Sequence, residues 1–362
     1  METLIGMTME QWLRVLKENQ FRIHPFKIPL VLMMTGMAIR NSYYAKKERY
    51  RYQEDIQKVS IKQPPIFILG HWRSGTTLLR NLLAQDSQFA YPTLLEIYNP
   101  AAFLTLEKKI EHSHALQRKW KRPMDNVKVS LLSPGEEEFA IGMLSGRTPL
   151  LAWSFPQHTA YYDRYLTFKT AEAWEIEEWR NAYEYFLKKL TYRYQKPLIL
   201  KSPPNTARIR LLHQLFPEAR FIHIHRNPFR VFQSTVKLYQ AAANRFSLQR
   251  PLPSNQMMEG ILQRYQTMYA AYWEDVADLP PHLIIDVAFE DLVKDFVGTI
   301  QEIYQHLNLD GFAAFKPRLE KAVQQMKNYQ TNQYEPLSEE YQRVIKERWG
   351  RYYQPWGYAN SA

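Results

Sequence analysis

The chain alternates short apolar runs with longer segments in which apolar and polar residues recur at helical spacing. Four short runs are bounded by Pro, Gly or charged residues: 64–70 (PPIFILG), 197–200 (PLIL), 221–225 (FIHIH) and 283–289 (LIIDVAF). Runs of this length between turn residues are typical of strands buried on both faces. We therefore predict a strand in each of them.

Helical patterns separate these predicted strands. They cover residues 75–84, 171–194, 206–216, 231–243, 258–277 and 292–307, and the first sixty residues are also helical in pattern. Segment 240–256 contains two prolines and two asparagines, so we expect a surface excursion there. Strands that alternate with helices predict a central parallel sheet covered on both faces, an α/β fold with three layers, α/β/α. We expect one domain over residues 61–362, with residues 1–60 as an N-terminal helical extension packed on it.

The longest uncharged apolar run covers only residues 28–39 (IPLVLMMTGMAI). A transmembrane helix needs roughly 20 such residues. The N-terminus carries Glu2, Glu10 and Glu18 and lacks the basic start and apolar core of a secretory signal, so we expect a cytoplasmic protein. We expect run 28–39 to pack on the domain or to line an acceptor pocket. Because basic residues flank it, peripheral contact with an anionic membrane is the alternative.

Composition narrows the chemistry. The 362 residues include no cysteine, which excludes disulfide frameworks, Cys-ligated zinc, iron–sulfur clusters and thiol nucleophiles. Lys and Arg number 47 against 36 Asp and Glu, a net charge of +11 that favours an anionic partner. The partner could be nucleic acid, a membrane surface or a small polyanion. No nucleic-acid-binding module is recognisable, so we expect no nucleic-acid partner.

A loop after the first predicted strand has the composition of a phosphate-binding loop. It reads Gly70-His71-Trp72-Arg73-Ser74-Gly75-Thr76-Thr77 and leads into a helix. Such a junction offers backbone N–H groups and a helix N-terminus to a phosphate. Its glycine spacing matches G-x-x-x-x-G-K-[ST], but Thr76 stands where that motif has lysine. An ordinary ATPase or kinase is therefore disfavoured, and a kinase with an atypical P-loop remains an alternative.

Two further cations follow predicted strands. Lys201 comes after 197–200, and Arg226 follows 221–225, where Asn227 and Pro228 suit the N-cap and first position of a helix. Ser234 falls about two turns into that helix, on the face of its cap. Ligands of open parallel sheets bind outside the carboxyl ends of the strands. We therefore expect Arg73, Lys201 and Arg226 to meet at one edge and bind a small ligand with several negative charges.

Together these motifs resemble the sulfotransferases that use 3′-phosphoadenosine-5′-phosphosulfate (PAPS), and segment 200–234 resembles the tyrosylprotein-type and bacterial members. The resemblance implies a P-loop NTPase-like sulfotransferase fold and PAPS as co-substrate. It implies that residues 73–77 bind the 5′-phosphosulfate and that Arg226 and Ser234 bind the 3′-phosphate. Lys201, with Arg73, would stabilise charge at the transferring sulfuryl group. The acceptor would be a hydroxyl group of a small molecule, a sugar or a lipid rather than a protein.

The resemblance is incomplete at two places. Leu78 stands where cytosolic members have tryptophan, and their C-terminal Arg-Lys-Gly clamp is absent. Lys327, Asn328 and Tyr334 are candidates for closing over the 3′-phosphate. Phe289-Glu290-Asp291-Leu292 is similar to the family's Tyr-Glu-Asp-Leu strand end, which is mainly structural.

The resemblance also implies a glutamate base about twenty residues after the first loop. Glu96 fits, but Thr93-x-x-Glu96 is also a capping box, so Glu96 could merely start a helix. Glu138 is the second candidate, since Ser133-x-x-Glu136 accounts for Glu136 as another capping box. We expect no metal, because the pair His112 and His114 has no third ligand nearby.

Overall fold

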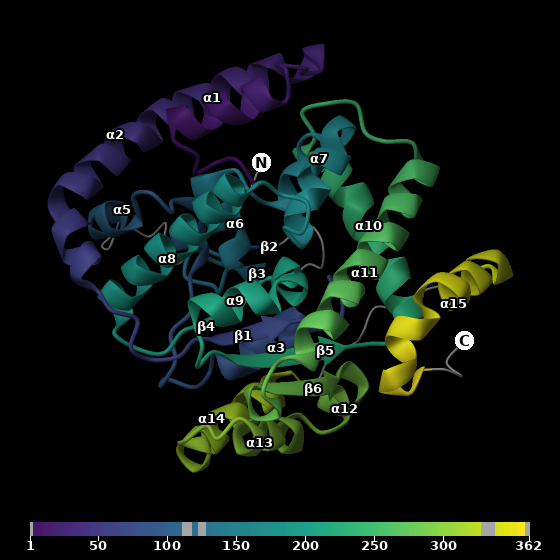
Figure 1. Cartoon of the computed structure of the whole chain (residues 1–362). Helices are drawn as coiled ribbons and strands as arrows, with labels where there is room; N and C mark the ends of the chain where they lie inside the picture. The colour runs from purple at the N-terminus through teal and green to yellow at the C-terminus, as the bar shows by residue number, and fades with distance from the viewer. Residues whose placement is uncertain (1–2, 111–117, 122–127, 327–336, 359–362) are drawn as a thin grey trace. The chain divides into compact units, whose positions relative to one another are not determined.

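The computed structural model describes residues 3–110, 118–121, 128–326 and 337–358 (Figure 1). The chain forms two compact units, each assembled from segments that are distant in sequence. The helical unit comprises Met1–Gln63, Tyr91–Lys196 and Leu238–Pro253, and the α/β unit comprises Pro64–Ala90, Pro197–Lys237 and Ser254–Ala362. The helices of residues 1–60 thus belong to the helical unit, and the predicted boundary at residue 60 stays a prediction.

The α/β unit is built on the predicted parallel sheet. Its strands are β1 (Ile66–Leu69), β4 (Ile199–Lys201), β5 (Arg220–His225) and β6 (Ile284–Ala288). All neighbours in the order β4-β1-β5-β6 are parallel. The four predicted strands are confirmed, and each lies within two residues of its predicted limits.

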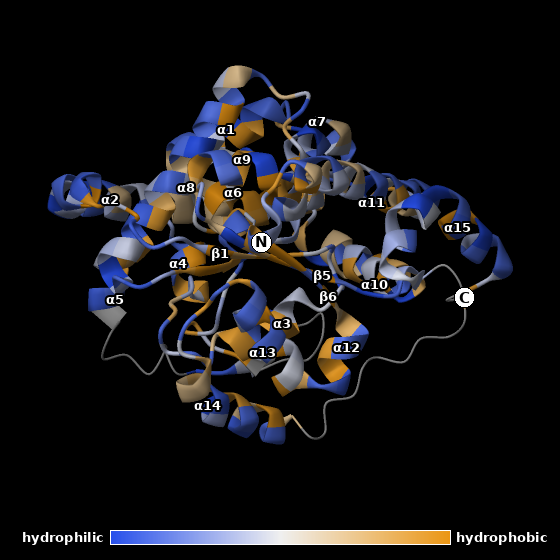
Figure 2. Ribbon diagram, turned by 60° about the horizontal axis from the view of Figure 1, so that its bottom comes forward, coloured by the Kyte–Doolittle hydropathy of each residue, from blue (hydrophilic) through white to orange (hydrophobic). Residues whose placement is uncertain are grey.

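Helices cover both faces of this sheet, which confirms the three-layer prediction (Figure 2). The helices of the unit are α3 (Thr76–Leu83), α9 (Ile209–Leu215), α11 (Ser254–Ala277), α12 (Phe289–Lys294), α13 (Phe296–His306), α14 (Phe312–Gln325) and α15 (Glu339–Tyr353), and α10 (Pro228–Phe246) starts there. Ile66 and Ile68 point into a core shared with α3, α12, α13 and α14. On the opposite face, the Phe67 ring stacks on Phe221 at 5.6 Å and lies 6.1 Å from Phe216, at the end of α9.

Residues 292–307 do not form the single helix predicted from their pattern. The chain breaks at Asp295, which leaves the helical conformation with φ −143° and ψ 88°. The Asp295 side chain then accepts a hydrogen bond from Gly298 N at 2.8 Å and caps α13. Aspartate is more stable as the N-cap of a helix than in a helix interior, because its side chain can bond the free N–H groups of the first turn.

The helical unit contains the remaining elements. These are α1 (Met9–Glu18), α2 (Ile28–Lys58), α4 (Leu94–Tyr98), α5 (Phe103–Ile110), α6 (Glu137–Ser145), α7 (Thr159–Asp163) and α8 (Ala173–Tyr194), with a hairpin of β2 (Trp120–Lys121) and β3 (Lys128–Val129). The apolar run 28–39 therefore opens a helix of 31 residues. Figure 1 shows α2 running beside α1 in this unit.

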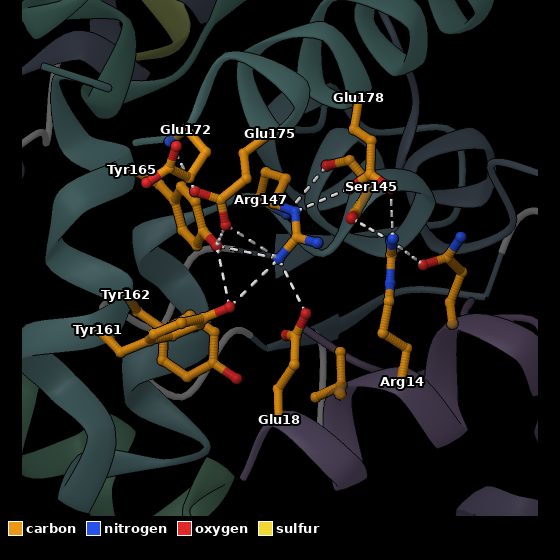
Figure 3. A network of polar contacts seen from close by, with 12 residues as sticks. Arg14, Glu18, Ser145, Arg147, Tyr161, Tyr162, Tyr165, Glu172, Glu175 and Glu178 are labelled. Carbon is orange, nitrogen blue, oxygen red and sulfur yellow. Dashed lines mark hydrogen bonds and ion pairs between the residues drawn. The ribbon is translucent and has the colours of Figure 1, made fainter. Parts of the chain in front are cut away.

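A buried arginine joins three parts of the helical unit (Figure 3). Arg147, only 1% exposed, donates to Glu18 at 2.9 Å and to Glu178 at 2.8 Å. The Tyr165 hydroxyl accepts from Arg147 at 2.9 Å and donates to Glu175 at 2.7 Å. Because a buried charge is tolerated only when it is paired and hydrogen-bonded, this network fixes α1, α8 and the loop before α8 together.

The prediction of a surface excursion over 240–256 is wrong for residues 240–249, whereas residues 250–256, apart from the half-buried Leu252, are exposed. Helix α10 extends through Phe246, and Ser247, Leu248 and Gln249 are buried in the helical unit. Leu248 exchanges backbone hydrogen bonds at 2.8 Å, donating to Ser154 O and accepting from His24 N. Residues 247–249 are therefore held by backbone pairing at Leu248 that their composition did not indicate.

Candidate functional site

The loop after β1 needs glycine at two positions. Gly70 has φ +140°, and a Cβ there would lie 2.4 Å from the Ile224 carbonyl oxygen. Gly75 has φ +110°, and a Cβ there would lie 2.3 Å from a ring carbon of Phe289. Side chains at these positions would clash with the sheet and with α12, so the glycines let the loop fold tightly against the strand end. Arg73 adopts a left-handed conformation too, with φ +73°, although it is not glycine.

The same loop presents unsatisfied donors. Helix α3 begins at Thr76, so Thr76 and Thr77 supply N–H groups that have no partner within the helix. Ser74 is 1% exposed, and its Oγ has no hydrogen-bond partner among the described residues. A buried hydroxyl without a partner costs free energy unless a bound group satisfies it. The loop therefore has the donors that an anion such as a phosphate would use.

The structure links this loop directly to α10. Arg73 Nε donates to Ser234 Oγ at 2.8 Å, and Ser234 is buried. Arg226 Nη1 donates to the Arg73 carbonyl oxygen at 3.4 Å, and its guanidinium lies 4.1 Å from the centroid of the Phe289 ring. Two segments 161 residues apart in sequence thus form one cationic site at the start of two helices.

The predicted start of α10 is confirmed. Asn227 Oδ1 accepts from Phe229 N at 3.0 Å and from Arg230 N at 3.2 Å, and Pro228 is the first helical residue. This cap fixes the direction in which Arg226 leaves the strand and places Ser234 two turns along the helix. Arg226 is partly exposed, which leaves it accessible to a ligand.

Lys201 lies at the same edge of the sheet. It is the last residue of β4, pairs in register with Ile68 of β1, and is 1% exposed. The strand order β4-β1-β5 puts the ends that carry Lys201, Arg73 and Arg226 side by side. The three cations therefore follow strand ends at the same edge of the sheet, as predicted. Their roles toward a ligand stay predictions.

The histidines near this edge are packed into the unit. The pKa of His71 falls to about 4, mainly because the ring is buried, and its Nδ1 contacts the Trp72 carbonyl oxygen at 2.8 Å. Burial and the neighbouring His223 lower the pKa of His225 to about 3. His223 and His225 share one face of β5, with ring centroids 6.1 Å apart. His223 Nδ1 lies 2.5 Å from Asp286.

Sequence reasoning missed several residues that support the site. Gly70 N donates to Thr206 Oγ1 at 2.7 Å. Thr206 lies in a short helical turn, Pro203–Ala207, whose two prolines had not indicated a helix. Glu290, named above only as part of a structural strand end, accepts from Asn227 N at 3.1 Å and from the Tyr358 hydroxyl at 2.6 Å. Trp356 stacks on His225 at 4.8 Å. Trp356 and Tyr358, which follow α15, are the aromatic residues from which this contact of the C-terminal segment with the sheet could have been predicted.

Glu96 is buried in the helical unit with partners on both carboxylate oxygens. The capping box is present: Glu96 Oε2 accepts from Thr93 N at 2.6 Å, and Thr93 Oγ1 accepts from Glu96 N at 3.4 Å. Glu96 Oε1 accepts from the Tyr194 hydroxyl at 2.9 Å and lies 3.3 Å from Arg193 Nε. Burial raises the pKa of Glu96, opposed by the Thr93 N–H and by Arg193. Glu96 does start a helix, and its role as a base stays a prediction.

Glu138 is also buried in the helical unit, in the first turn of α6. Its Oε1 accepts from the Thr148 hydroxyl at 2.6 Å. The second predicted capping box is wrong, because α6 starts at Glu137 and the Glu136 side chain makes no capping bond. Ser133 Oγ instead accepts from Ser130 N at 2.9 Å.

Some candidates cannot be placed. Lys327, Asn328, Tyr334 and the pair His112 and His114 lie outside the described residues. Within the described ranges, no three His, Asp or Glu side chains are grouped so that they could hold a metal ion. Among the same residues, no helix has both the length and the apolar character to cross a bilayer.

Known proteins match this chain over most of its length. The profile of the sulfotransferase family matches residues 64–314. The omega-hydroxy-beta-dihydromenaquinone-9 sulfotransferase Stf3 of Mycobacterium bovis is 32% identical over 354 residues, which are 98% of this chain and 90% of that protein. The Mycobacterium tuberculosis protein of the same name matches equally.

Solved structures agree on the fold. Sulfotransferase STF9 from Mycobacterium avium superposes with a TM-score of 0.66 at 15% identity, covering 97% of each chain. Sulfotransferase STF1 from Mycobacterium tuberculosis superposes with a TM-score of 0.60 at 17% identity, covering 87% of this chain and 86% of that one. The phosphate-loop geometry and the family match point the same way: the chain belongs to the sulfotransferase family.

Proposed function

We propose that this protein transfers a sulfuryl group from PAPS to a hydroxyl group of a lipid acceptor. The observation that carries the proposal is the Arg73 to Ser234 hydrogen bond of 2.8 Å. It ties together the two segments that the resemblance assigns to opposite ends of one nucleotide. A donor with a 5′-phosphosulfate and a 3′-phosphate would satisfy both segments at once.

The α/β unit offers the donor a set of fixed cations and N–H groups. In this proposal Ser74, Thr76 and Thr77 bind the 5′-phosphosulfate, supported by the unpartnered Ser74 hydroxyl. Arg226 and Ser234 bind the 3′-phosphate. Lys201 and Arg73 stabilise the negative charge that grows on the leaving phosphate, because preorganised cations act most strongly where charge develops.

Glu96 is our proposed base for the acceptor proton, and Glu138 is the alternative. Burial raises the pKa of Glu96 and so makes its carboxylate a better proton acceptor. Glutamine at either position is the informative change, because it keeps a hydrogen-bonding side chain of the same shape and removes the proton acceptor.

The acceptor class comes from the relatives. The Stf3 proteins are named for a hydroxylated menaquinone, and they match nearly the whole of this chain. We therefore propose a hydroxyl-bearing isoprenoid quinone or a similar lipid as acceptor. A cytoplasmic location stays a prediction. Because the chain belongs to the sulfotransferase family, we do not propose a kinase activity.

Donor binding is tested by isothermal titration with 3′-phosphoadenosine-5′-phosphate. We expect micromolar binding to the unaltered protein and its loss in Arg226→Ala. Arg220→Ala is the matched control, since Arg220 starts the strand whose end leads to Arg226 and lies at the opposite edge of the sheet. No measurable binding to the unaltered protein would overturn the donor assignment.

Acceptor class is tested separately by transfer of radiolabelled sulfate from PAPS. We expect transfer to a hydroxylated menaquinone and little transfer to sugars, phenols or peptides. Transfer to one of those classes instead would refute the lipid acceptor and leave the donor assignment intact.

A further inference from the structure

Helix α2 has one face that is fixed to the protein and an opposite face that is not covered. Met34, Ala38, Asn41, Ala45 and Glu48 are buried at intervals of three and four residues, which is one stripe of the helix. Large apolar side chains occupy the other side: Ile28 is 50% exposed, Leu32 67%, Ile39 58% and Tyr43 64%. Phe26, just before the helix, is 90% exposed.

Polar contacts fix the rotation of α2, so the exposed stripe is a permanent surface. Asn41 Nδ2 donates to the carbonyl oxygens of Ile5 at 2.8 Å and Met7 at 3.0 Å. Glu48 forms an ion pair with Lys189 of α8, and both side chains are fully buried. Turning the apolar stripe inward would break this pair and leave two buried charges without partners, which is strongly unfavourable.

The same surface is strongly basic. Between positions 19 and 53 the sequence has seven Lys or Arg residues, and its one acidic residue there is the buried Glu48. At roughly 100° per residue, Arg40 and Lys47 lie along one side of the apolar stripe and Lys46 along the other. We call the surface formed by Phe26, Ile28, Leu32, Ile39, Arg40, Tyr43, Lys46 and Lys47 the α2 face.

We propose that the α2 face docks this protein on an anionic lipid bilayer. Apolar side chains flanked by Lys and Arg are the combination with which interfacial helices bind such surfaces: the apolar groups enter the headgroup region and the cations meet lipid phosphates. A second copy of the chain is a poor occupant, because it would bring an equally basic surface against this one. The inference stands on α2 alone and goes beyond the proposed function, so it survives failure of the donor-binding test.

Vesicle flotation of the full-length protein tests the proposal. We expect binding to vesicles of phosphatidylcholine mixed with phosphatidylglycerol and much weaker binding to phosphatidylcholine alone. Raising NaCl to about 1 M, where the Debye length is about 3 Å, weakens the binding. No binding to anionic vesicles, or equal binding to both vesicle types, would overturn the proposal.

Two pairs of substitutions separate the two parts of the α2 face. Arg40→Glu with Lys46→Glu removes two cations, and we expect the partition coefficient for anionic vesicles to fall at least about thirtyfold. Lys316→Glu with Lys321→Glu, on exposed positions of α14, makes the same change in net charge and serves as control. Equal effects of the two pairs would show that net charge alone drives binding and would refute the docking face.

The apolar part has its own variants. Leu32→Glu with Ile39→Glu abolishes flotation in our proposal, whereas Leu132→Glu, at an exposed residue outside α2, leaves it unchanged. All four positions of α2 changed here are exposed, and circular dichroism checks that each variant is folded. Light scattering without vesicles tests the alternative that a second copy of the chain covers the α2 face. A dimer that dissociates in the variant Leu32→Glu with Ile39→Glu would assign the α2 face to that second copy instead.

Discussion

The contact between Arg73 and Ser234 leads to a quantitative prediction about donor binding. Arg73→Lys keeps the positive charge but has no Nε–H group at the position that bonds Ser234. Ser234→Ala removes the acceptor of the same hydrogen bond. We expect the two changes to be non-additive in their effect on the affinity for 3′-phosphoadenosine-5′-phosphate, because each one destroys the same link.

The size of this coupling follows from what the link does. In the proposed binding mode each single change removes a charged hydrogen bond to the nucleotide, typically about 1.5–3 kcal/mol. Each also frees the side chain at position 73, arginine or lysine, which must then be ordered on binding at about 0.5–1.5 kcal/mol. The ordering cost arises once, so the double variant loses about 1 kcal/mol less than the sum of the single losses. That difference is a factor of about five in Kd.

Isothermal titration of the unaltered protein, both single variants and the double variant measures the coupling. Thr235→Val is the matched control, since the Thr235 hydroxyl is buried on the same helix and donates to Val231 O at 2.7 Å, away from the loop. The reasoning is refuted if the losses add within about 0.3–0.5 kcal/mol, which is the behaviour of independent sites. It is also refuted if Ser234→Ala binds as tightly as the unaltered protein.

Three further changes test the fold and the base. We expect Arg147→Met to lower the free energy of unfolding in urea by about 3–5 kcal/mol, because it leaves buried carboxylates without their partner. Arg14→Met, at a more exposed position of the same network, should lower it by less than about 1 kcal/mol. Equal losses would contradict the buried network. Glu96→Gln keeps an acceptor for Thr93 N but loses the carboxylate oxygen that faces Tyr194 and Arg193, so the free energy of unfolding falls by about 1–3 kcal/mol. We expect kcat of the folded variant to fall about 10²–10⁴-fold, and full activity would rule out Glu96 as the base. Gly75→Ala, at φ +110°, costs about 1–3 kcal/mol of stability and weakens nucleotide binding, whereas Gly36→Ala, in open space on α2, costs nothing; a tolerated Gly75→Ala would show that the loop can relax.

The sheet and the loop after β1 could be predicted from sequence because local signals and tertiary structure agreed there. Each strand is a short apolar run ended by Gly, Pro or a charge, and each leads into a helix or a helical turn. Asn227 and Pro228 show this agreement at the start of α10. The Asn227 side chain caps the helix, and Pro228 occupies its first position, where the missing N–H of proline costs nothing. Convergence of the three cations then followed from the rule that parallel strands end at one edge.

The failures occurred where a side chain had two possible local roles. Asp295 could lie within a helix or cap the next one, and it caps α13 by accepting from Gly298 N at 2.8 Å. Ser133 could have capped α6, but it accepts from Ser130 instead, and α6 starts later. The stretch after Phe246 looked like a free loop, because nothing in its composition encodes the distant backbone of Ser154 with which it pairs. Such long-range pairings are invisible to a local pattern.

The left-handed backbone of Arg73 has a consequence for protein engineering. An arginine at φ +73° carries conformational strain of about 1–3 kcal/mol that glycine at the same place would not. A selection for thermal stability alone would therefore favour Arg73→Gly and discard the guanidinium that meets Ser234. Stabilised versions of this protein have to be chosen with nucleotide binding as a second criterion, since the proposed role of Arg73 in donor binding requires the side chain that stability at this position disfavours.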